Sequence, residues 1–527
     1  MESQASIFTT CQQSFPDGNT TTLLECISNS LQDDEDSRLT NLHDFLFVMT
    51  GAMIFFMQAG FASLCAGAVR IKNVQNTMLK NLLDACGAAI GFFLVGYAFA
   101  FGGQDDDTRT TFVGTTDFVS TGPRPAFWFF QFAFSATSVT IVAGTLAERC
   151  QMAAYLCYSV FLVAFIYPVI AHAIWSNNGF LSHFNVDPFL GVGTLDFAGA
   201  GVVHVTGGTT ALFATIILGP RRGRFYDSQG EPLETPAPFP GHSMALQLLG
   251  TMILWFGWFG FNAGSALVLK TPDIGTNAAN AAVATALCGA MGGISALITN
   301  LWLEERRTGE PSFSLVMAMN GALSGLVAST GGCALVEPWA AVVTGLVSGW
   351  LYIAGSAYLL RVRIDDAVDA IPVHMVNGIW GLLAVGLFAS PRKLELAYGS
   401  VEHAGWFYNF SDAHLLAAQV CEALFIFGWT FFTMIPFFVW LNYQGWLRAD
   451  SLEELVGLDI SYHGGKNSRE SGSVKKEYID AYERHKGNIR SRKIGNSHHN
   501  STIRSQSDMD DPDYDQHAAA REAMQET

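Results

Sequence analysis

The sequence predicts an all-α integral membrane protein with eleven transmembrane helices. Half of the 527 residues are hydrophobic and only 14% are Asp, Glu, Lys or Arg, whereas soluble domains carry about a quarter charged residues. Apolar runs of about 20 residues, the length that crosses a bilayer, recur along the chain. The 52 glycines and 40 phenylalanines suit helices that face lipid and pack closely together. The net charge of −17 argues against nucleic-acid binding, because it would repel a polyanion.

Eleven apolar runs follow one another in the sequence. They begin near His43, Met78, Pro125, Gln151, Asp196, His242, Thr276, Phe313, Val336, Asp369 and Asp412. Together they predict a transmembrane domain over 43–443, preceded by an acidic segment over 1–42. A short ordered segment is expected over 444–465. The tail over 466–527 is rich in Ser, Lys, Asp and His, which predicts that it is largely disordered.

The distribution of Lys and Arg predicts the orientation, because cytoplasmic loops carry an excess of them. With the N-terminus outside, eleven Lys and Arg fall in inner loops and six in outer segments. An odd number of spans then places the C-terminal tail in the cytoplasm, so we expect an N-out, C-in topology. On the outer side, Cys11 and Cys26 could pair in a disulfide, and Asn19 opens a glycosylation sequon. The polar start is not typical of a cleaved signal peptide.

Two histidines lie inside apolar spans, where ionisable residues are costly and indicate function. His204 and His374 each follow an aspartate by eight residues, Asp196 and Asp366 respectively. They fall in the fifth and tenth spans, which cross the membrane in opposite directions. This pattern predicts an inverted five-plus-five repeat with an eleventh helix outside it. In such repeats the substrate site lies near the midplane, between the two halves.

The histidines have a structural alternative, in which a backbone carbonyl satisfies each imidazole. A facing pair could instead share a proton and pass it on, since a neutral imidazole donates on one nitrogen and accepts on the other. A metal needs three or four ligands, and with no third His or Cys at this depth we expect none. Asp196 fits both an N-cap and a buried acid that organises a cation path. Asp366 and Asp369 are expected to cap and brace the tenth span.

Aromatic residues gather at the predicted outer ends of three spans. They occupy 130–134 in the third span, Trp175 in the fourth and 255–261 in the sixth, with Ser265 close behind. An interfacial aromatic belt is the ordinary explanation. Aromatic faces also bind cations, and the Ser265 hydroxyl can accept a hydrogen bond. Above two midplane histidines, such a cup suits a small cation that can lose a proton.

These residues resemble those of the Amt/Mep/Rh superfamily of ammonium transporters, in particular the high-affinity branch of plants and algae. The matching stretches are 57–62, 69–74, 144–149, 196–208, 218–225, 258–265, 337–339, 369–381 and 455–465. The resemblance covers roughly residues 43–465 in order. It implies a homotrimer, or a heterotrimer with paralogues, in which each eleven-helix subunit has its own pore.

The resemblance also implies roles for individual residues, each at a position that matches the family. The outer recruitment site corresponds to Trp175, Phe134 and Ser265, the stacked gate beneath it to Phe134 and Phe261, the twin histidines to His204 and His374, the essential buried acid to Asp196, and pore-neighbouring positions to Gln131, Trp258, Thr330, Asp366 and Asp369. In the tail, Gly457, Asp459 and His463 match a segment that docks on a neighbouring subunit. Ser461 stands at the place of a regulatory phosphorylatable Thr, and Tyr462 where Arg is usual.

The expected function is high-affinity-type ammonium transport in the plasma membrane, without enzymatic activity or a cofactor. Ammonium would be recruited and deprotonated, ammonia would cross the apolar pore, and the proton would follow the histidines in a net electrogenic uptake. Expected partners are ammonium or ammonia, methylammonium, the lipid bilayer, other copies of the chain and a kinase acting on the tail, with no nucleic acid. The alternatives are an electroneutral Rh-type gas channel and an ammonium sensor that signals through its tail. A membrane-embedded hydrolase would need a nucleophile or metal, and the sequence shows none in reach.

Overall fold

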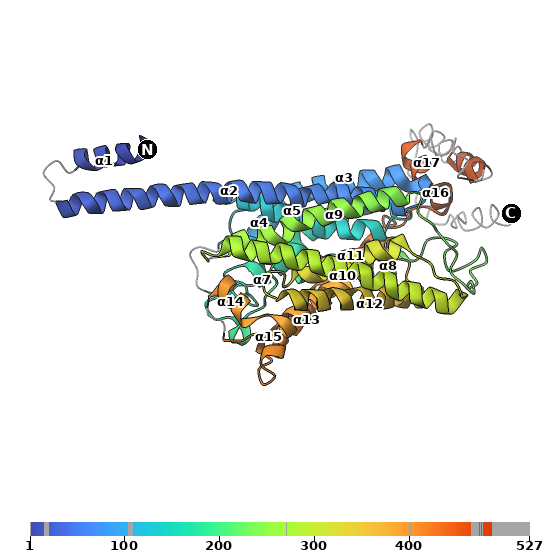
Figure 1. The fold of residues 1–527 in the computed structure, drawn as a ribbon. Coiled ribbons are helices and arrows are strands. Elements are labelled where there is room, and N and C mark those ends of the chain that lie inside the picture. The colour runs from blue at the N-terminus through green and yellow to red at the C-terminus, as the bar shows by residue number, and fades with distance from the viewer. Residues whose placement is uncertain are drawn as a thin grey trace, which may run out of the picture.

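The long helices of the chain run side by side in one bundle (Figure 1). The structure, a computed structural model, describes residues 2–14, 20–103, 109–269, 271–399, 402–464, 474, 476 and 478–486. Over these residues the regular secondary structure is helical, without strands. Asn19 of the predicted sequon lies outside the described residues, as does most of the tail over 466–527.

Eleven spans make up the bundle. In order they are α2 (Thr20–Ala68), α3 (Val74–Gly91) with η2 (Phe92–Gly96) and α4 (Tyr97–Phe101), α5 (Pro125–Thr145), α6 (Met152–Phe161) with η3 (Leu162–Ile166) and α7 (Tyr167–Trp175), η5 (Ala200–Val205) with α8 (Thr206–Leu218), α9 (Met244–Gly264) with η6 (Ser265–Val268), α10 (Ile274–Thr308), α11 (Leu315–Thr330), α12 (Pro338–Arg361), η7 (Ile371–Val376) with α13 (Asn377–Phe388), and α15 (His414–Tyr443). Ten of them have the length and apolar composition to cross a membrane, and α11 is a shorter apolar helix. The predicted all-α membrane fold is confirmed.

Short helices lie between and after the spans. They are η1 (Ile71–Asn73), η4 (Phe189–Gly191), α14 (Pro391–Tyr398), η8 (Trp406–Tyr408), α16 (Ser451–Val456) and α17 (Leu458–His463). We call the end of the bundle that holds α7 and α14 the mouth face, and the opposite end, which holds α16 and α17, the tail face (Figure 1). Residues 478–486, inside the tail expected to be largely disordered, are helical, and Tyr482 packs in an apolar cluster with Leu452 and Val456.

The N-terminal segment is helical and continuous with the first span. The helix therefore starts before the apolar run that predicts the span. Helix α2 starts at Thr20, well before His43, and extends beyond the bundle at the mouth face (Figure 1). Helix α1 (Glu2–Ser14) packs along this extension. A disulfide between Cys11 and Cys26 joins the two helices. The pairing that the sequence left open is therefore made within this segment.

The fifth and tenth spans approach each other closely at the centre of the bundle. A Cβ atom at Gly208 would lie 2.4 Å from the backbone nitrogen of Met375, and one at Gly378 would lie 2.7 Å from the carbonyl oxygen of Ala200. Glycine at both positions therefore permits backbone contact, as small residues commonly do between membrane helices. Each span opens with a π-helical turn, η5 or η7, and each turn carries one of the two buried histidines.

Candidate functional site

A cavity of about 760 Å³ opens at the mouth face. Its walls include Gln131, Phe134, Trp175, Asp196 and Ser265. The sequence places these residues on four different spans or their approaches, and the fold brings them around one space. The cavity therefore combines aromatic faces, a hydroxyl and a buried carboxyl.

Two phenylalanines pack together where the cavity meets the interior of the bundle, with their rings tilted by 36° and not stacked as expected. The ring centroids of Phe134 and Phe261 are 4.2 Å apart, and both side chains are almost fully buried. Trp175 meets Phe134 edge to face at 5.7 Å and donates its indole N–H to the carbonyl oxygen of Asp196. The Ser265 hydroxyl donates to the carbonyl oxygen of Phe261 at 2.9 Å. Its lone pairs stay available, so Ser265 can accept a hydrogen bond from a cation in the cavity.

The two histidines face each other on the inner side of Phe261. The ring of His204 lies 5.7 Å from that of Phe261 and 5.2 Å from that of His374. The two Nδ1 atoms are 3.1 Å apart, so one must donate and the other accept. His204 Nε2 is buried and has no hydrogen-bond partner among the described residues. His204 is thus bonded to another imidazole, not to a backbone carbonyl.

Trp258 and Thr330 hold His204 in place. The Trp258 ring stacks on His204 at 5.3 Å, and its N–H donates to the Thr330 hydroxyl at 3.0 Å. Gln131 is buried in the cavity wall, and its Oε1 atom has no partner among the described residues. Of the five predicted pore-neighbouring residues, Gln131 therefore lies at the cavity, Trp258 lies against His204 and Thr330 holds Trp258.

Asp196 closes the start of the fifth span. Its Oδ1 accepts the backbone N–H groups of Gly199 and Ala200, and its Oδ2 accepts those of Gly201 and Val202, at 2.7–3.1 Å. Gly199 has φ of +98°, a left-handed conformation that glycine adopts without strain. Four donors on one carboxylate make Asp196 a helix cap and a stabilised negative charge at once, so both roles weighed for it are compatible with the geometry.

The aspartates of the tenth span lie at its tail-face end and differ in their partners. Asp366 accepts the N–H groups of Val368 and Ile371, as a cap does. Asp369 accepts the hydroxyls of Tyr352 and Ser356 on α12 and thereby braces the span laterally. Asp196 and Asp366 thus occupy corresponding places in the fifth and tenth spans.

One buried acid next to this site was missed by the sequence reasoning. Glu422 on α15 is fully buried, and its Oε1 lies close to Gly201. The signal was available, because an acid inside an apolar span is expected to be functional. The eleventh span lies outside the predicted repeat, so the position of Glu422 has no counterpart in the other half.

Comparison with known proteins decides the family. The model of the Ammonium Transporter Family matches residues 45–468. The chain is 38% identical to Ammonium transporter 1 member 3 of Solanum lycopersicum over 82% of this chain and 94% of the relative. It is 42% identical to Ammonium transporter Amt2 of Archaeoglobus fulgidus, over 80% and 87% of the two chains. The chain belongs to the ammonium transporter family. It is therefore a multi-pass membrane transporter of ammonium and not an enzyme.

Solved structures agree with this assignment. One described as "Sensor Amt Protein" has a TM-score of 0.68 and 33% identity, covering 80% of this transporter and 98% of that chain. The crystal structure of Candida albicans Mep2 has a TM-score of 0.67 and 25% identity, covering 77% and 86%. Both solved structures thus share the fold of this chain.

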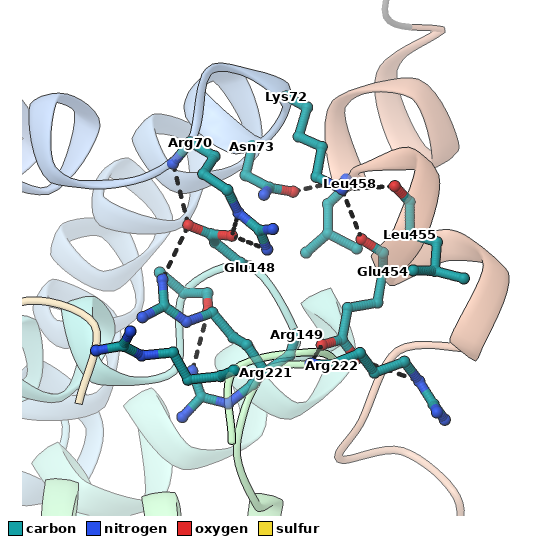
Figure 2. Close-up of polar contacts among 12 residues, drawn as sticks. Arg70, Lys72, Asn73, Glu148, Arg149, Arg221, Arg222, Glu454, Leu455 and Leu458 are labelled. Carbon is teal, nitrogen blue, oxygen red and sulfur yellow. Dashed lines mark hydrogen bonds and ion pairs between the residues drawn. The ribbon is translucent and has the colours of Figure 1, made fainter. Parts of the chain in front are cut away.

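A buried charge cluster ties the loops of this ammonium transporter together at the tail face (Figure 2). Glu148, between α5 and α6, accepts from Arg70 and from Arg221. Arg221 also pairs with both oxygens of Asp365 at 2.8 and 2.9 Å. Burial raises the pKa of Glu148, but the charges of Arg221 and Arg70 outweigh it and hold the pKa below its usual range. Glu148 is therefore ionised and joins three loops.

Replacing Glu148 by Gln is expected to destabilise the tail face. Arg70 would lose its ion pair with Glu148, whereas Arg221 would keep its ion pair with Asp365. Breaking a buried ion pair costs about 3–5 kcal/mol. Since folding lowers the pKa of Glu148, its stabilisation exists above the unfolded value of about 4.3 and disappears as the pH falls through the lower folded value. Thermal unfolding of purified protein between pH 7 and pH 3 measures both effects. Glu310→Gln, an exposed residue at the same face, is the control, and equal stability of the two variants at pH 7 would contradict the prediction.

The C-terminal segment docks beside this cluster on η1 and α3 of its own chain. Asp459 accepts the N–H groups of Gln75 and Asn76, and Leu458 N–H donates to the Asn73 side chain. Lys72 donates to the carbonyl oxygens of Glu454 and Leu455 (Figure 2). The remaining predicted tail residues join these contacts.

Three of those residues fit the docked geometry closely. Gly457 has φ of +99°, and a Cβ atom there would lie 2.6 Å from the carbonyl oxygen of Lys72. The Ser461 hydroxyl donates to the carbonyl oxygen of Gly457, and His463 Nε2 lies 3.2 Å from the Asn76 amide nitrogen. The segment therefore makes an intrachain dock, and its docking on a neighbouring subunit stays a prediction.

Asp459→Asn is expected to loosen this dock, because the charged acceptor of two backbone N–H groups becomes a neutral amide. A hydrogen bond to a charged group contributes about 1.5–3 kcal/mol. Hydrogen exchange of the α17 amides should therefore accelerate by about tenfold or more. Asp480→Asn, in the helix at 478–486, is the matched control. Unchanged exchange in α17 would show that Asp459 does not hold the segment.

Proposed function

We propose that this ammonium transporter performs high-affinity-type, net electrogenic ammonium uptake across the plasma membrane, with the mouth face outside and the tail face in the cytoplasm. The observation that carries the proposal is the 3.1 Å contact between the Nδ1 atoms of His204 and His374 on the inner side of the packed Phe134 and Phe261 rings. A pair of imidazoles at that depth offers a proton a path that the aromatic rings deny to a hydrated ion.

Recruitment takes place in the mouth cavity. Trp175 and Phe134 present aromatic faces, which attract a partly desolvated cation by about 2 kcal/mol. The Ser265 hydroxyl, which donates to Phe261, accepts a hydrogen bond from ammonium. Potassium has no hydrogen to donate, so this contact favours ammonium. The negative charge of Asp196, next to Trp175 in the cavity wall, stabilises the bound cation.

Deprotonation follows because a charge cannot enter the apolar interior cheaply. Ammonium separates into ammonia and a proton in the upper pore near Asp196, and neutral ammonia passes between Phe134 and Phe261. A proton that arrives on the unpartnered Nε2 of His204 allows that ring to give its Nδ1 proton to His374. His374 then releases a proton from its own Nε2. One positive charge moves inward for each ammonium taken up.

Assembly and regulation complete the proposal. The chain works as a homotrimer, or as a heterotrimer with paralogues, and methylammonium is a second substrate. A kinase acts on Ser461, whose neighbours include Asp459 in the docked segment. A phosphate there would add negative charge beside that carboxylate and undock the segment by repulsion. Gly457 and His463 then lose their contacts with η1 and α3.

The test is voltage-clamp current on adding ammonium to cells that express the chain, with uptake of labelled methylammonium recorded alongside. The expected result is an inward, saturating current that potassium does not produce. Uptake without current would replace the proposal with neutral, Rh-type ammonia permeation.

Ammonium sensing through the tail is the second candidate function. The likeness to the structure described as "Sensor Amt Protein" and the docked C-terminal segment favour it. Neither current nor uptake from protein shown to be at the cell surface would make it the leading function.

A further inference from the structure

Glu422 is a carboxyl group buried without a hydrogen-bond partner. It lies in the first third of α15, is 0% exposed, and neither Oε1 nor Oε2 has a partner among the described residues. An isolated ionised carboxylate in such a place would be far too costly, since its desolvation has no compensation. The group must therefore hold a proton or share one.

The fold places Glu422 against the start of the fifth span. Its Oε1 would lie 2.6 Å from a Cβ atom at Gly201, so only glycine leaves room for it. One turn earlier on α15, the Gln419 amide accepts from the N–H of Leu195 and donates to its carbonyl oxygen. These contacts fix α15 on the turn that carries Asp196. The N–H of Gly201 donates to Asp196 Oδ2 at 2.9 Å, so the two acids lie against the same glycine, and the charge of Asp196 acts on Glu422.

The hydrogen-bond partners of the two acids are very unequal. The Asp196 carboxylate accepts four backbone N–H groups, whereas Glu422 accepts none. Two adjacent buried carboxyls cannot both be ionised, and hydrogen bonds to the charged form decide which one keeps the charge. The single negative charge of the pair therefore belongs on Asp196 and the proton on Glu422.

We propose that Glu422 is a protonated carboxylic acid that donates its hydrogen to the Asp196 carboxylate and is a positioning residue of the ammonium site. In this form Glu422 adds a hydrogen bond to the four that Asp196 already accepts and fixes the orientation of the carboxyl beneath the mouth cavity. Its proton also limits the negative charge of the two acids to one unit, which is carried by Asp196. The eleventh helix, outside the inverted repeat, thereby becomes part of the transport site.

The first test reads the proton directly and needs no transport. The C=O stretching band of a protonated carboxylic acid lies at a higher frequency than the bands of a carboxylate or an amide. Infrared spectra of the full chain in lipid bilayers at neutral pH should lose one such band in Glu422→Gln. Glu402→Gln, an exposed residue of the mouth face, should leave the spectrum unchanged. Retention of every carboxylic acid band in Glu422→Gln would overturn the proposal.

The second test concerns positioning and rests on the proposed function. A Gln side chain still donates to Asp196, whereas a Leu of similar size cannot. Glu422→Gln should keep methylammonium uptake within about twofold of the unchanged protein, and Glu422→Leu should lower it more than tenfold, the effect of losing a hydrogen bond to a charged group. Loss of uptake in both variants, or in neither, would overturn the positioning role.

The two tests separate the possible failures. If the unchanged protein moves neither charge nor methylammonium, the proposed function fails, while the infrared band still decides where the proton lies. If transport is normal and the band is absent, the shared proton alone is rejected. Surface labelling and gel filtration confirm that each variant is folded before its uptake is compared.

Discussion

His204→Leu is expected to abolish the ammonium-induced current. Leucine fills a similar volume in this fully buried position, so the fold should persist. It has no atom that can accept or donate a proton, and the 3.1 Å contact with His374 disappears. Voltage clamp measures the current, and labelled methylammonium uptake shows whether neutral permeation remains.

The matched control for this prediction is His414→Leu. His414 lies at the mouth face, its side chain is more than half exposed, and it pairs with Asp412. It makes no contact with His204 or His374 and has no role in the proposed relay. Its replacement should leave the current within about twofold of normal. A normal current in His204→Leu, with surface expression shown to be intact, would rule out the histidine relay.

Asp196→Asn is expected to have an effect of similar size on transport and to weaken the fold as well. The four N–H groups that now meet a carboxylate would face an amide, whose NH₂ group cannot accept from any of them. Hydrogen bonds to a charged group contribute about 1.5–3 kcal/mol each. We expect methylammonium uptake to fall by about 100-fold or more and the thermal unfolding midpoint of purified protein to decrease.

Asp187→Asn is the control for that experiment. Asp187 is exposed on the loop that precedes the fifth span, so losing its charge should alter neither uptake nor unfolding. If Asp196→Asn were as stable as the control and yet inactive, the carboxylate would be needed for transport and not for the stability of the fold. Full activity in Asp196→Asn would reject any role for its charge.

The sequence alone determined the membrane fold and singled out the two histidines at its centre. A span is a local property, because length and hydropathy over about 20 residues suffice to predict it. The spacing from Asp196 to His204 recurs from Asp366 to His374, and ionisable residues at that depth are rare enough to indicate a site. The order of the spans then placed the two histidines in oppositely directed helices.

Only the tertiary structure decided which side chains meet. The approach of Glu422 to Gly201, the disulfide between Cys11 and Cys26 and the dock of Asp459 on α3 all join segments that are far apart in the chain or whose pairing the sequence left open. Helix α2 also begins at Thr20, because a polar helix can precede an apolar one and hydropathy marks only the start of the apolar run. Lateral contacts between membrane helices depend on close packing and hydrogen bonds, since lipid is as apolar as the helices themselves. Hydropathy therefore predicts the spans, and packing selects their partners.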